Sequence, residues 1–289
     1  MAGAIVVGDY HLRKEDIDPI VKGFALQSYI FKDSLMIKNS KSWKDTYYRE
    51  TAADLTGGTG SAVRGIPRGA AFPQGQVNWT KVSAYIEKYG MEGTIYYEDT
   101  ITDEIDVASR TLLRIARAVT KAVDDQIYSE VSSNAGNSVT ISVGYEWDSA
   151  TIAQRNPIQD ILNAIKLINI DNYDIQGQNG ELWLNPTDYT NLLGNSSVVN
   201  AGQFYTKTVT KTGKIEHIVG LRVKVSNSVT DDEAIVMIPK ISGTWVQVDP
   251  LRTKTTVDEG ISWTVRAFEL GVVQITNPNA IAKITNTQA

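Results

Sequence analysis

Residue types on which catalysis most often depends are sparse in this sequence. The chain has no cysteine, which excludes disulfides and thiolate metal sites, and its only histidines are His11 and His217. His11 falls in a loose N-terminal stretch and His217 in a predicted strand, which are poor places for the base of a Ser-His-Asp site. Residues 211–213 match the Lys-Thr-Gly element of serine β-lactamases, but the chain contains no Ser-x-x-Lys motif. We therefore expect no catalytic residues.

A glycine-rich segment, residues 56–76, is the next candidate, because such loops can cradle phosphates. Gly60 and Gly65 have the first spacing of a P-loop, but an Ile-Pro pair follows where Lys and Ser/Thr must reach phosphate and Mg²⁺. The dinucleotide fingerprint also fails, since Val63 occupies the place of its third glycine. The segment instead predicts the flexible distal part of a long hairpin, and we expect no cofactor.

Acidic residues could in principle bind a hard cation. One group lies at the start of a long predicted helix: Glu98, Asp99, Asp103, Glu104 and Asp106. The helix dipole accounts for the last three of them, which lie in its first turn. A second stretch, 171–181, loosely resembles a calcium loop, but Tyr173 breaks its ligand pattern and a polar turn is the better interpretation. The sequence therefore predicts no metal site.

Basic side chains form the one pattern with a plausible binding role. Four of them recur at four-three-four spacing along the long helix, and we call this set the basic face: Arg110, Arg114, Arg117 and Lys121. Such a stripe can be a solvated face, can pair with acidic residues of a neighbouring subunit, or can make loose contact with phosphate. Arg64 and Arg68 form a second basic pair near the hairpin tip, where arginine suits intersubunit ion pairing.

One long helix and the strands ahead of it position these candidates. Thr102 is the expected N-cap of a helix over 103–132, with an apolar stripe at Ile105, Ala108, Leu112, Ala116, Val119, Val123 and Ile127. A helix of about 30 residues spans about 45 Å, which is long for a domain of this size. Residues 43–51 and 77–97 have strand composition, so the hairpin projects ahead of the helix.

Composition bounds the class of protein. The chain has 289 residues, 42% hydrophobic residues and a net charge of −5, so it is globular and unlike a sequence-specific nucleic-acid binder. The N-terminus has no adequate apolar run for a signal peptide, and no segment is long enough to span a membrane. We expect a cytosolic protein when it is made, with no membrane partner.

The remaining elements mix helices and strands without a βαβα rhythm, which favours an α+β fold. Residues 137–147 alternate as a half-buried strand would, and Asn156–Pro157 opens a helix with an apolar face at Ile158, Ile161, Leu162, Ile165 and Ile168. A strand at 182–184 leads into a helix near Pro186. Further strands are predicted at 215–225, 233–238, 244–248, 261–270 and 280–284.

The order of these parts resembles the major capsid proteins of tailed viruses, which have the HK97-type fold. The resemblance covers nearly the whole chain and rests on an N-terminal arm, the Gly-tipped hairpin and the spine helix ending in VDDQI at 123–127. It also rests on LWLNPTDY at 182–189 and IVGLRVKV at 218–225. Each motif is loose, and their order and spacing together are specific.

The resemblance implies a division of the chain and a structural function. The implied parts are an N-terminal arm (1–42), an E-loop (43–82), a P-domain with the spine helix (83–150), an A-domain (151–240), P-domain return strands (241–271) and a C-terminal A-domain strand (272–289). Such subunits form pentamers and hexamers of an icosahedral shell around double-stranded DNA, in the virion and, during assembly, in the host cytoplasm. Because the arm begins almost at Met1, the resemblance implies that any scaffold is separate or already removed.

The implied partners are other copies of the chain, with portal, decoration and scaffolding proteins as separate chains and packaged DNA in non-specific contact at the inner surface. Two alternatives stay open. Encapsulin-type nanocompartment shells share the fold, and an enzyme or binding module with a lid-like arm is the unrelated alternative.

Overall fold

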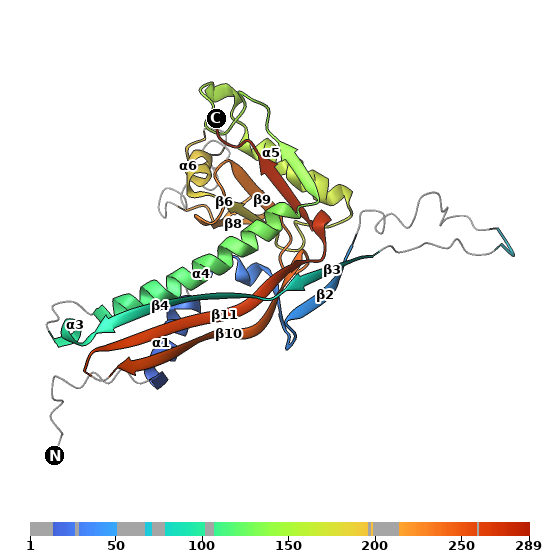
Figure 1. Cartoon of the computed structure of the whole chain (residues 1–289). Coiled ribbons are helices and arrows are strands. Elements are labelled where there is room, and N and C mark those ends of the chain that lie inside the picture. The colour runs from blue at the N-terminus through green and yellow to red at the C-terminus, as the bar shows by residue number, and fades with distance from the viewer. Residues whose placement is uncertain are drawn as a thin grey trace, which may run out of the picture.

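Two β-sheets and one long helix organise the chain (Figure 1). The computed structural model describes residues 14–26, 29–50, 67–70, 79–101, 107–195, 198, 214–258 and 260–289. A third, two-stranded sheet extends from the end of the longer sheet. Within the described residues, no helix is both long and apolar enough to cross a bilayer.

The longer sheet has the strand order β1-β10-β11-β4. Its strands are β1 (Met36–Asn39), β10 (Gly243–Asp258), β11 (Ser262–Ile275) and β4 (Glu87–Tyr96). β10 and β11 form a long antiparallel pair, β4 adds antiparallel to β11, and β1 adds parallel to β10. Segments from both ends of the chain therefore share one sheet.

Strand β10 runs ten residues beyond the predicted end at Val248, so that prediction was wrong in length. Pro250 lies inside it and has no N–H to donate, which is a sequence signal against a continuing strand. The register with β11 shifts between Gln247 and Asp249 and again between Asp249 and Arg252. These irregularities accommodate the proline, and the regular pairing resumes beyond them.

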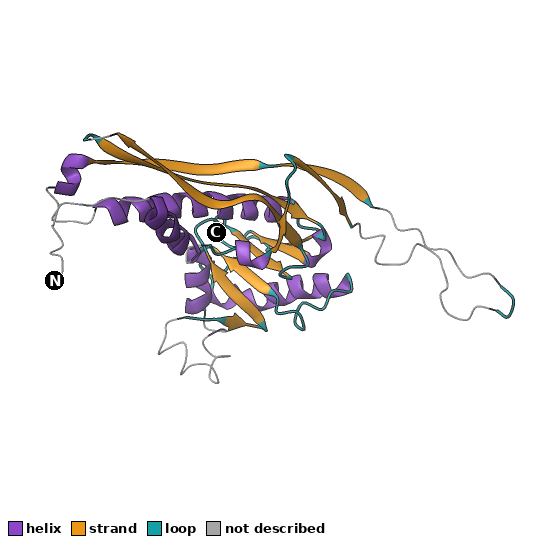
Figure 2. Ribbon diagram, turned by 90° about the horizontal axis from the view of Figure 1, so that it is seen from below, coloured by secondary structure: helices purple, strands orange, loops and turns teal. Residues whose placement is uncertain are grey.

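Helices cover one face of this sheet (Figure 2). Helix α4 (Val107–Ser133) contacts β4 and β11, and α1 (Lys14–Leu26) contacts α4 and β10. Most of the predicted apolar stripe of α4 is buried, namely Leu112, Ala116, Val119, Val123 and Ile127. The expected N-cap and the first residues of the helix, 102–106, lie outside the described residues.

The chain bends earlier than expected between β4 and α4. We predicted strand composition through Tyr97, but β4 ends at Tyr96 and the short helix α3 (Tyr97–Ile101) begins there. Glu98 and Asp99 occupy its first turn, where their negative charges interact favourably with the positive end of the helix dipole.

The second sheet has the order β5-β12-β9-β6-β8-β7. Its strands are β5 (Asn137–Thr140), β12 (Ile281–Thr285), β9 (Glu233–Met237), β6 (Glu181–Leu184), β8 (Leu221–Val225) and β7 (His217–Ile218). Helices α5 (Pro157–Ile170) and α6 (Pro186–Gly194) accompany it, and α5 packs on β5, β9 and β12. Three short 3₁₀ helices complete the described elements: η1 (Lys32–Ser34), η2 (Ile152–Gln154) and η3 (Pro278–Ala280).

The helix starts predicted at Asn156–Pro157 and near Pro186 are both confirmed. Asn156 caps α5 by accepting from Gln159 N–H at 3.4 Å, and Asn185 caps α6 by accepting from Thr187 N–H at 2.9 Å. In each case proline follows at the first helical position, where its missing N–H costs nothing. One member of the expected α5 face, Leu162, is exposed rather than buried.

The predicted strand over 137–147 is wrong beyond Thr140. Its alternating apolar residues beyond that point lie in a turn in which Gly144 has φ +91° and donates its N–H to the Glu146 carboxylate at 2.8 Å. Val143 is 88% exposed, while Trp147 is buried and donates its indole N–H to Asp160 at 3.1 Å. A turn can thus mimic the period of a strand.

The hairpin is confirmed where the structure describes it. Strands β2 (Lys44–Arg49) and β3 (Thr80–Tyr85) pair antiparallel, and β3 leads through Ile86 into β4. Most of the predicted glycine-rich tip lies outside the described residues, apart from the turn 67–70.

Candidate assembly surfaces and the basic face of helix α4

The basic face of α4 is exposed along its whole length, because the opposite face of the helix packs on β4, β11 and α1. Lys121 pairs with Asp125, one turn further along, at 2.9 Å. Among the described residues, no carboxylate lies within ion-pair distance of Arg110, Arg114 or Arg117. Three guanidinium groups therefore lie on one helix face, available to a phosphate or a carboxylate.

The second basic pair is separate from this face. Arg68 is exposed in the turn 67–70, where Gly69 has φ +86° and Ala70 N–H bonds Pro67 O at 3.0 Å. Arg64 lies outside the described residues. The structure thus brings together four of the six predicted residues.

The hairpin presents one fully exposed face. Cross-strand pairs Lys44 with Tyr85, Thr46 with Ser83 and Tyr48 with Lys81 all point to this side, which we call the hairpin face: Lys44, Thr46, Tyr48, Lys81, Ser83 and Tyr85. The two tyrosines are about 60% exposed, and Lys44 lies 5.5 Å from the centre of the Tyr85 ring. The other side of the hairpin is hydrogen-bonded to β11, since Arg49 donates to Ile275 O at 3.3 Å and Gln274 donates to Asp45 at 3.2 Å.

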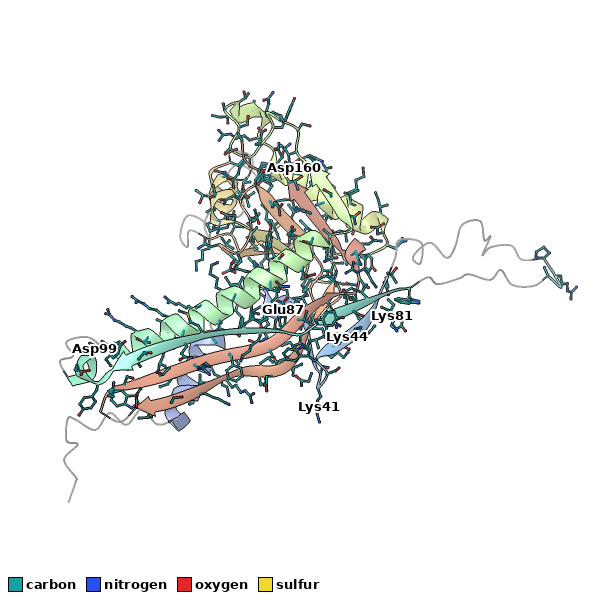
Figure 3. All side chains as sticks on the ribbon, in the orientation of Figure 1. Lys41, Lys44, Lys81, Glu87, Asp99 and Asp160 are labelled. Atoms are coloured by element: carbon teal, nitrogen blue, oxygen red, sulfur yellow. The ribbon has the colours of Figure 1, made fainter. Side chains whose placement is uncertain are left out.

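Apolar and acidic residues gather at the opposite end of the long sheet. There Ser262 pairs with both Asp258 and Tyr96, and Tyr97 N–H bonds Ile261 O at 3.0 Å. Six of the exposed side chains at this end form what we call the sheet tip: Tyr96, Glu98, Asp99, Val257, Asp258 and Ile261. In Figure 3, Asp99 marks this end and Lys44 and Lys81 mark the hairpin end.

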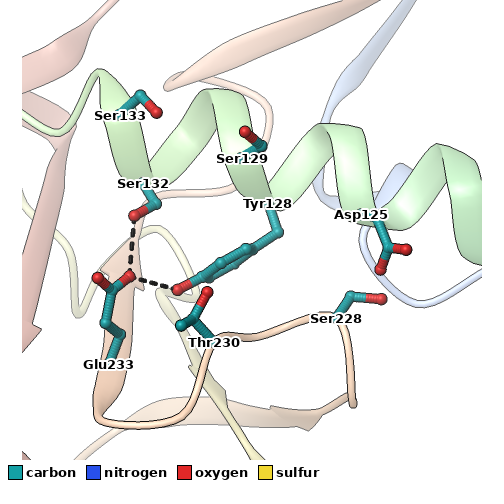
Figure 4. A pocket seen from close by; sticks show the side chains of 8 residues that line it. All are labelled: Asp125, Tyr128, Ser129, Ser132, Ser133, Ser228, Thr230 and Glu233. Atoms are coloured by element: carbon teal, nitrogen blue, oxygen red, sulfur yellow. Dashed lines mark hydrogen bonds between the residues drawn. The ribbon is translucent and has the colours of Figure 1, made fainter.

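A polar pocket lies between α4 and the loop before β9 (Figure 4). Tyr128 and Ser132 both donate to Glu233, at 2.5 and 3.0 Å, and Lys283 forms an ion pair with the same carboxylate. Burial alone would raise the pKa of Glu233, but the hydrogen bonds from Lys283, Tyr128 and Ser132 outweigh it and lower the pKa. Burial, then Glu233, raises the pKa of Tyr128 to about 12. This arrangement ties α4 to β9 and β12 and contains no histidine beside a hydroxyl.

The remaining sequence candidates do not converge. His217 lies exposed on β7, as predicted, while His11 and residues 211–213 lie outside the described part of the chain. Asp174 accepts from Gly177 N–H at 3.0 Å, which confirms a polar turn there. Among the described residues, no three acidic or histidine side chains group as metal ligands would.

Sequence reasoning missed the hairpin face and the sheet tip as surfaces. The hairpin face combines exposed tyrosines with lysines, and the sheet tip combines exposed apolar side chains with carboxylates. The hairpin register that puts Tyr48 beside Lys81 was not specified by the sequence alone. The alternation of 44, 46 and 48 against 81, 83 and 85 was the available signal.

The family model that matches this chain is that of phage capsid proteins, over residues 79–284. Among curated proteins, none matches in sequence. Among solved structures, the capsid of cyanophage P-SCSP1u is similar with a TM-score of 0.67 at 13% identity, covering 89% of this chain and 88% of that one. The virus-like particle from Pyrococcus furiosus has a TM-score of 0.64 at 13% identity and covers 93% and 98%. The mature capsid of bacteriophage PhiM1 has a TM-score of 0.64 at 14% identity and covers 90% and 88%.

These likenesses confirm the HK97-type α+β fold expected from the sequence. The family match spans well over half of the chain, from the second hairpin strand to the C-terminal strand β12. The chain therefore belongs to the phage capsid protein family, as a structural shell protein of the tailed-phage major capsid type.

Proposed function

We propose that this chain assembles into pentamers and hexamers of an icosahedral shell that encloses double-stranded DNA. The observation that carries the proposal is the pair of exposed surfaces at opposite ends of the long sheet. The hairpin face carries two lysines and no acidic residue, while the sheet tip carries three carboxylates and no basic residue. A surface that combines exposed aromatics with one sign of charge suits a partner of the opposite sign.

A head-to-tail contact follows from this arrangement. If the hairpin face of one copy lies on the sheet tip of the next, the contact is heterologous, and such contacts generate closed rings when the rotation closes. Five-fold and six-fold rings then use the same contact, with slightly different angles between neighbouring subunits. Arg68, in the turn beyond the hairpin strands, is in this proposal a further intersubunit residue, together with Arg64.

The basic face of α4 is the proposed contact for DNA at the inner surface. An acidic chain repels tightly packed DNA except at local basic positions, and three arginines on one helix face supply them. Contacts of this kind neutralise phosphates without reading bases, so we expect binding that is blind to sequence and sensitive to salt.

The division into regions is part of the proposal. We assign 43–82 to an E-loop, 83–150 and 241–271 to a P-domain, 151–240 and 272–289 to an A-domain, and 1–42 to an N-terminal arm. The arm contributes to the core in its described part, because Val21, Phe31 and Leu35 are buried. We further propose that the chain acts without catalysis in the virion, is assembled in the host cytoplasm, and meets portal, decoration and scaffolding proteins as separate chains.

A nanocompartment shell is the second candidate function. The observation in its favour is the likeness to the virus-like particle from Pyrococcus furiosus, which extends over 93% of this chain and 98% of that one. In this alternative the shell encloses protein cargo in place of DNA.

Electron microscopy and analytical ultracentrifugation of the purified full chain test assembly. Closed shells or rings of five and six are the expected result, and a monomer at every concentration and salt tested would contradict the proposal. Nuclease treatment of particles purified from cells then separates the two functions. Protected double-stranded DNA supports a virion shell, while nucleic-acid-free particles with a bound protein support a nanocompartment.

A further inference from the structure

Strand β1 is one edge of the long sheet, and among the described residues no strand pairs with its outer side. Met36–Asn39 pair with residues 244–247 of β10, and no further backbone hydrogen bond of these four residues is present in the described part of the chain. The N–H and C=O groups of a strand alternate between its two sides, so the outer side of β1 presents unpaired donors and acceptors. This edge can accept another extended segment.

The side chains of β1 leave apolar surface exposed on both faces of the sheet. Met36 and Ile37 are consecutive, so they point to opposite faces, and each is 54% exposed. The one charged side chain of the strand, Lys38, is paired with Asp45 at 3.0 Å. A strand that bound here would therefore cover a large apolar residue on each face.

The other open edges of the long sheet carry residues that discourage pairing. β4, at the opposite edge, contains Glu87, Lys88 and Glu92. β10 has no described neighbour on the β1 side beyond Gln247, and Pro250 lies in that part of it. Charged side chains and proline are common protections of a sheet edge. β1 has no proline and no unpaired charge, so among the described edges of this sheet it is the one most suited to a partner strand.

A segment of matching chemistry lies near the start of the chain, outside the described residues. We call it the N-terminal run: Ala4, Ile5, Val6 and Val7. Its β-branched side chains favour an extended conformation, it contains no charge or proline, and it has the same length as β1. Such a segment gains main-chain hydrogen bonds and buries apolar side chains when it joins an open edge.

The course of helix α1 indicates which copy donates the run. Val21 packs with residues 112–119 of α4, whereas Phe31 N–H binds Asp124 further along the same helix. The chain therefore advances from the sheet-tip half of α4 toward β1, and α1 begins in the sheet-tip half (Figure 1). Residue 7 is at most about 25 Å from Lys14 by chain length, and α1 alone is about 20 Å long. The run of the same chain would have to fold back along the whole helix to reach its own β1.

We propose that the N-terminal run of one copy adds as a strand to the outer edge of β1 in a neighbouring copy. This inference rests on the proposed head-to-tail contact, which places the sheet tip of one copy at the hairpin of the next. β1 lies at the base of that hairpin, because residues 40–43 connect it directly to β2. A copy that donates its run to one neighbour accepts a run from the other, so the strand exchange continues around a ring.

Single cysteines test the pairing, because the chain has none of its own. Full-length chains with Ile5→Cys, Val6→Cys or Val7→Cys are each mixed with chains that carry Met36→Cys or Ile37→Cys, and the mixtures are assembled and oxidised. Mass spectrometry of the linked peptides then measures the disulfide between the two kinds of chain. Since each chain has one thiol, this product forms only between copies.

Strand pairing predicts which of these mixtures react. Val6→Cys should link to one of the two β1 cysteines, and Ile5→Cys or Val7→Cys should link to the other, because successive side chains of a strand point to opposite faces. The favoured pairs should exceed the others about tenfold, since a disulfide needs Cβ atoms about 4 Å apart. In the control, Ile170→Cys on α5, which replaces a similarly exposed isoleucine, takes the place of Ile37→Cys and should give only the background yield.

Different results overturn the strand exchange and the function on which it rests. Particles that assemble but show no disulfide above the control, or equal yields in all the mixtures, exclude strand exchange and leave the shell function standing. A chain with both Val6→Cys and Ile37→Cys that forms the disulfide only within itself places the run on its own β1 and excludes donation to a neighbour. A wild-type chain that never assembles contradicts the proposed function and, with it, the exchange between copies.

A proline variant measures what the donated strand contributes to assembly. Val6→Pro removes one N–H from the run, so the concentration at half-assembly should rise about tenfold, which corresponds to the loss of one or two main-chain hydrogen bonds. Ala2→Pro, which lies outside the run, should stay within about threefold of wild type. Equal assembly of the two variants would contradict the strand contact.

Discussion

The proposed head-to-tail contact predicts a specific charge-reversal phenotype. Changing Lys44 and Lys81 of the hairpin face to Glu places two negative charges against the acidic sheet tip of the next copy. Exposed ion pairs contribute about 0.5 kcal/mol each, so two pairs give about 1 kcal/mol of attraction. Reversal turns this into repulsion of similar size, a change of about 2 kcal/mol per contact. Each subunit of a ring makes one such contact through its hairpin, so the concentration at half-assembly should rise about 30-fold.

Light scattering and sedimentation over a concentration series measure this shift. The compensating variant carries Lys44→Glu and Lys81→Glu together with Glu98→Lys and Asp99→Lys, which reverses both lysines of the hairpin face and two of the three carboxylates of the sheet tip in one chain. It should assemble at nearly the wild-type concentration in low salt, whereas each half-swap should not. The difference among the variants should shrink at about 1 M salt, where the screening length is about 3 Å.

A matched control makes the same charge change elsewhere. Lys166 of α5 and Arg222 of β8 are exposed and lie on neither surface, so Lys166→Glu with Arg222→Glu should leave the assembly concentration within about threefold of wild type. If the hairpin variant assembles like this control, or if the full swap fails to restore assembly while both half-swaps stay folded, the contact is refuted. Shell formation by the wild type would still stand.

Three further perturbations follow from the structure. Gly271→Ala should destabilise the chain by about 2 kcal/mol or more in thermal or urea unfolding, because a Cβ there would lie 2.3 Å from the buried Trp245 ring. The control is Gly23→Ala on helix α1, where a Cβ meets no atom within 4 Å, and it should be neutral or stabilising by up to about 1 kcal/mol. Changing all four residues of the basic face to Gln should preserve helix content by circular dichroism but lower DNA retention. DNA retention by this variant should also depend less on salt than retention by the wild type. Identical salt curves for the two proteins would show that the basic face only contacts solvent. Deleting 57–76 should leave the near-ultraviolet spectrum and soluble yield of the chain intact while impairing shell closure in negative-stain images, and loss of soluble protein would show that the segment belongs to the core.

Local signals in the sequence predicted the helices and their starts well. The stripe of α4 recurs at three-and-four spacing over many turns, and burial of Leu112 through Ile127 follows directly from that period. Asn156–Pro157 predicted the start of α5 and Pro186 that of α6, because a residue without N–H suits the first position of a helix. These features depend only on neighbours in the chain.

Strand limits were less predictable because pairing partners decide them. β10 continues past Pro250 because it pairs with β11 again beyond the register shifts, and no residue pattern within β10 itself predicts this. The alternation at 141–147 gave the opposite error, where a turn at Gly144 buried Trp147 without any partner strand. In both places tertiary contacts, rather than local propensity, decided where the strand ends.

The buried carboxylates Asp124, Glu181 and Glu269 show which part of a buried polar cluster the sequence can indicate. Glu181 precedes an apolar Leu-Trp-Leu run, Glu269 interrupts an apolar strand, and Asp124 follows Val123 on the inner side of α4. A carboxylate at such a position must be hydrogen-bonded or paired, because burying it alone costs several kcal/mol. Each of the three was therefore a visible signal of a buried partner.

The identity of those partners could not be read from the chain. Lys32 is separated from Glu269 by 237 residues and Ser34 from Glu181 by 147, so only the fold that brings both sheets against α4 makes them neighbours. Glu269 and Glu181 each pair with a lysine, whereas Asp124 accepts from the backbone N–H groups of Ile30 and Phe31. Tyr29 and Lys32, the two partners of Glu269, lie beside the two N–H groups that Asp124 binds. The position of this one stretch of chain against α4 and β11 therefore decides whether two buried carboxylates are satisfied, and no pattern within either helix or strand specifies it.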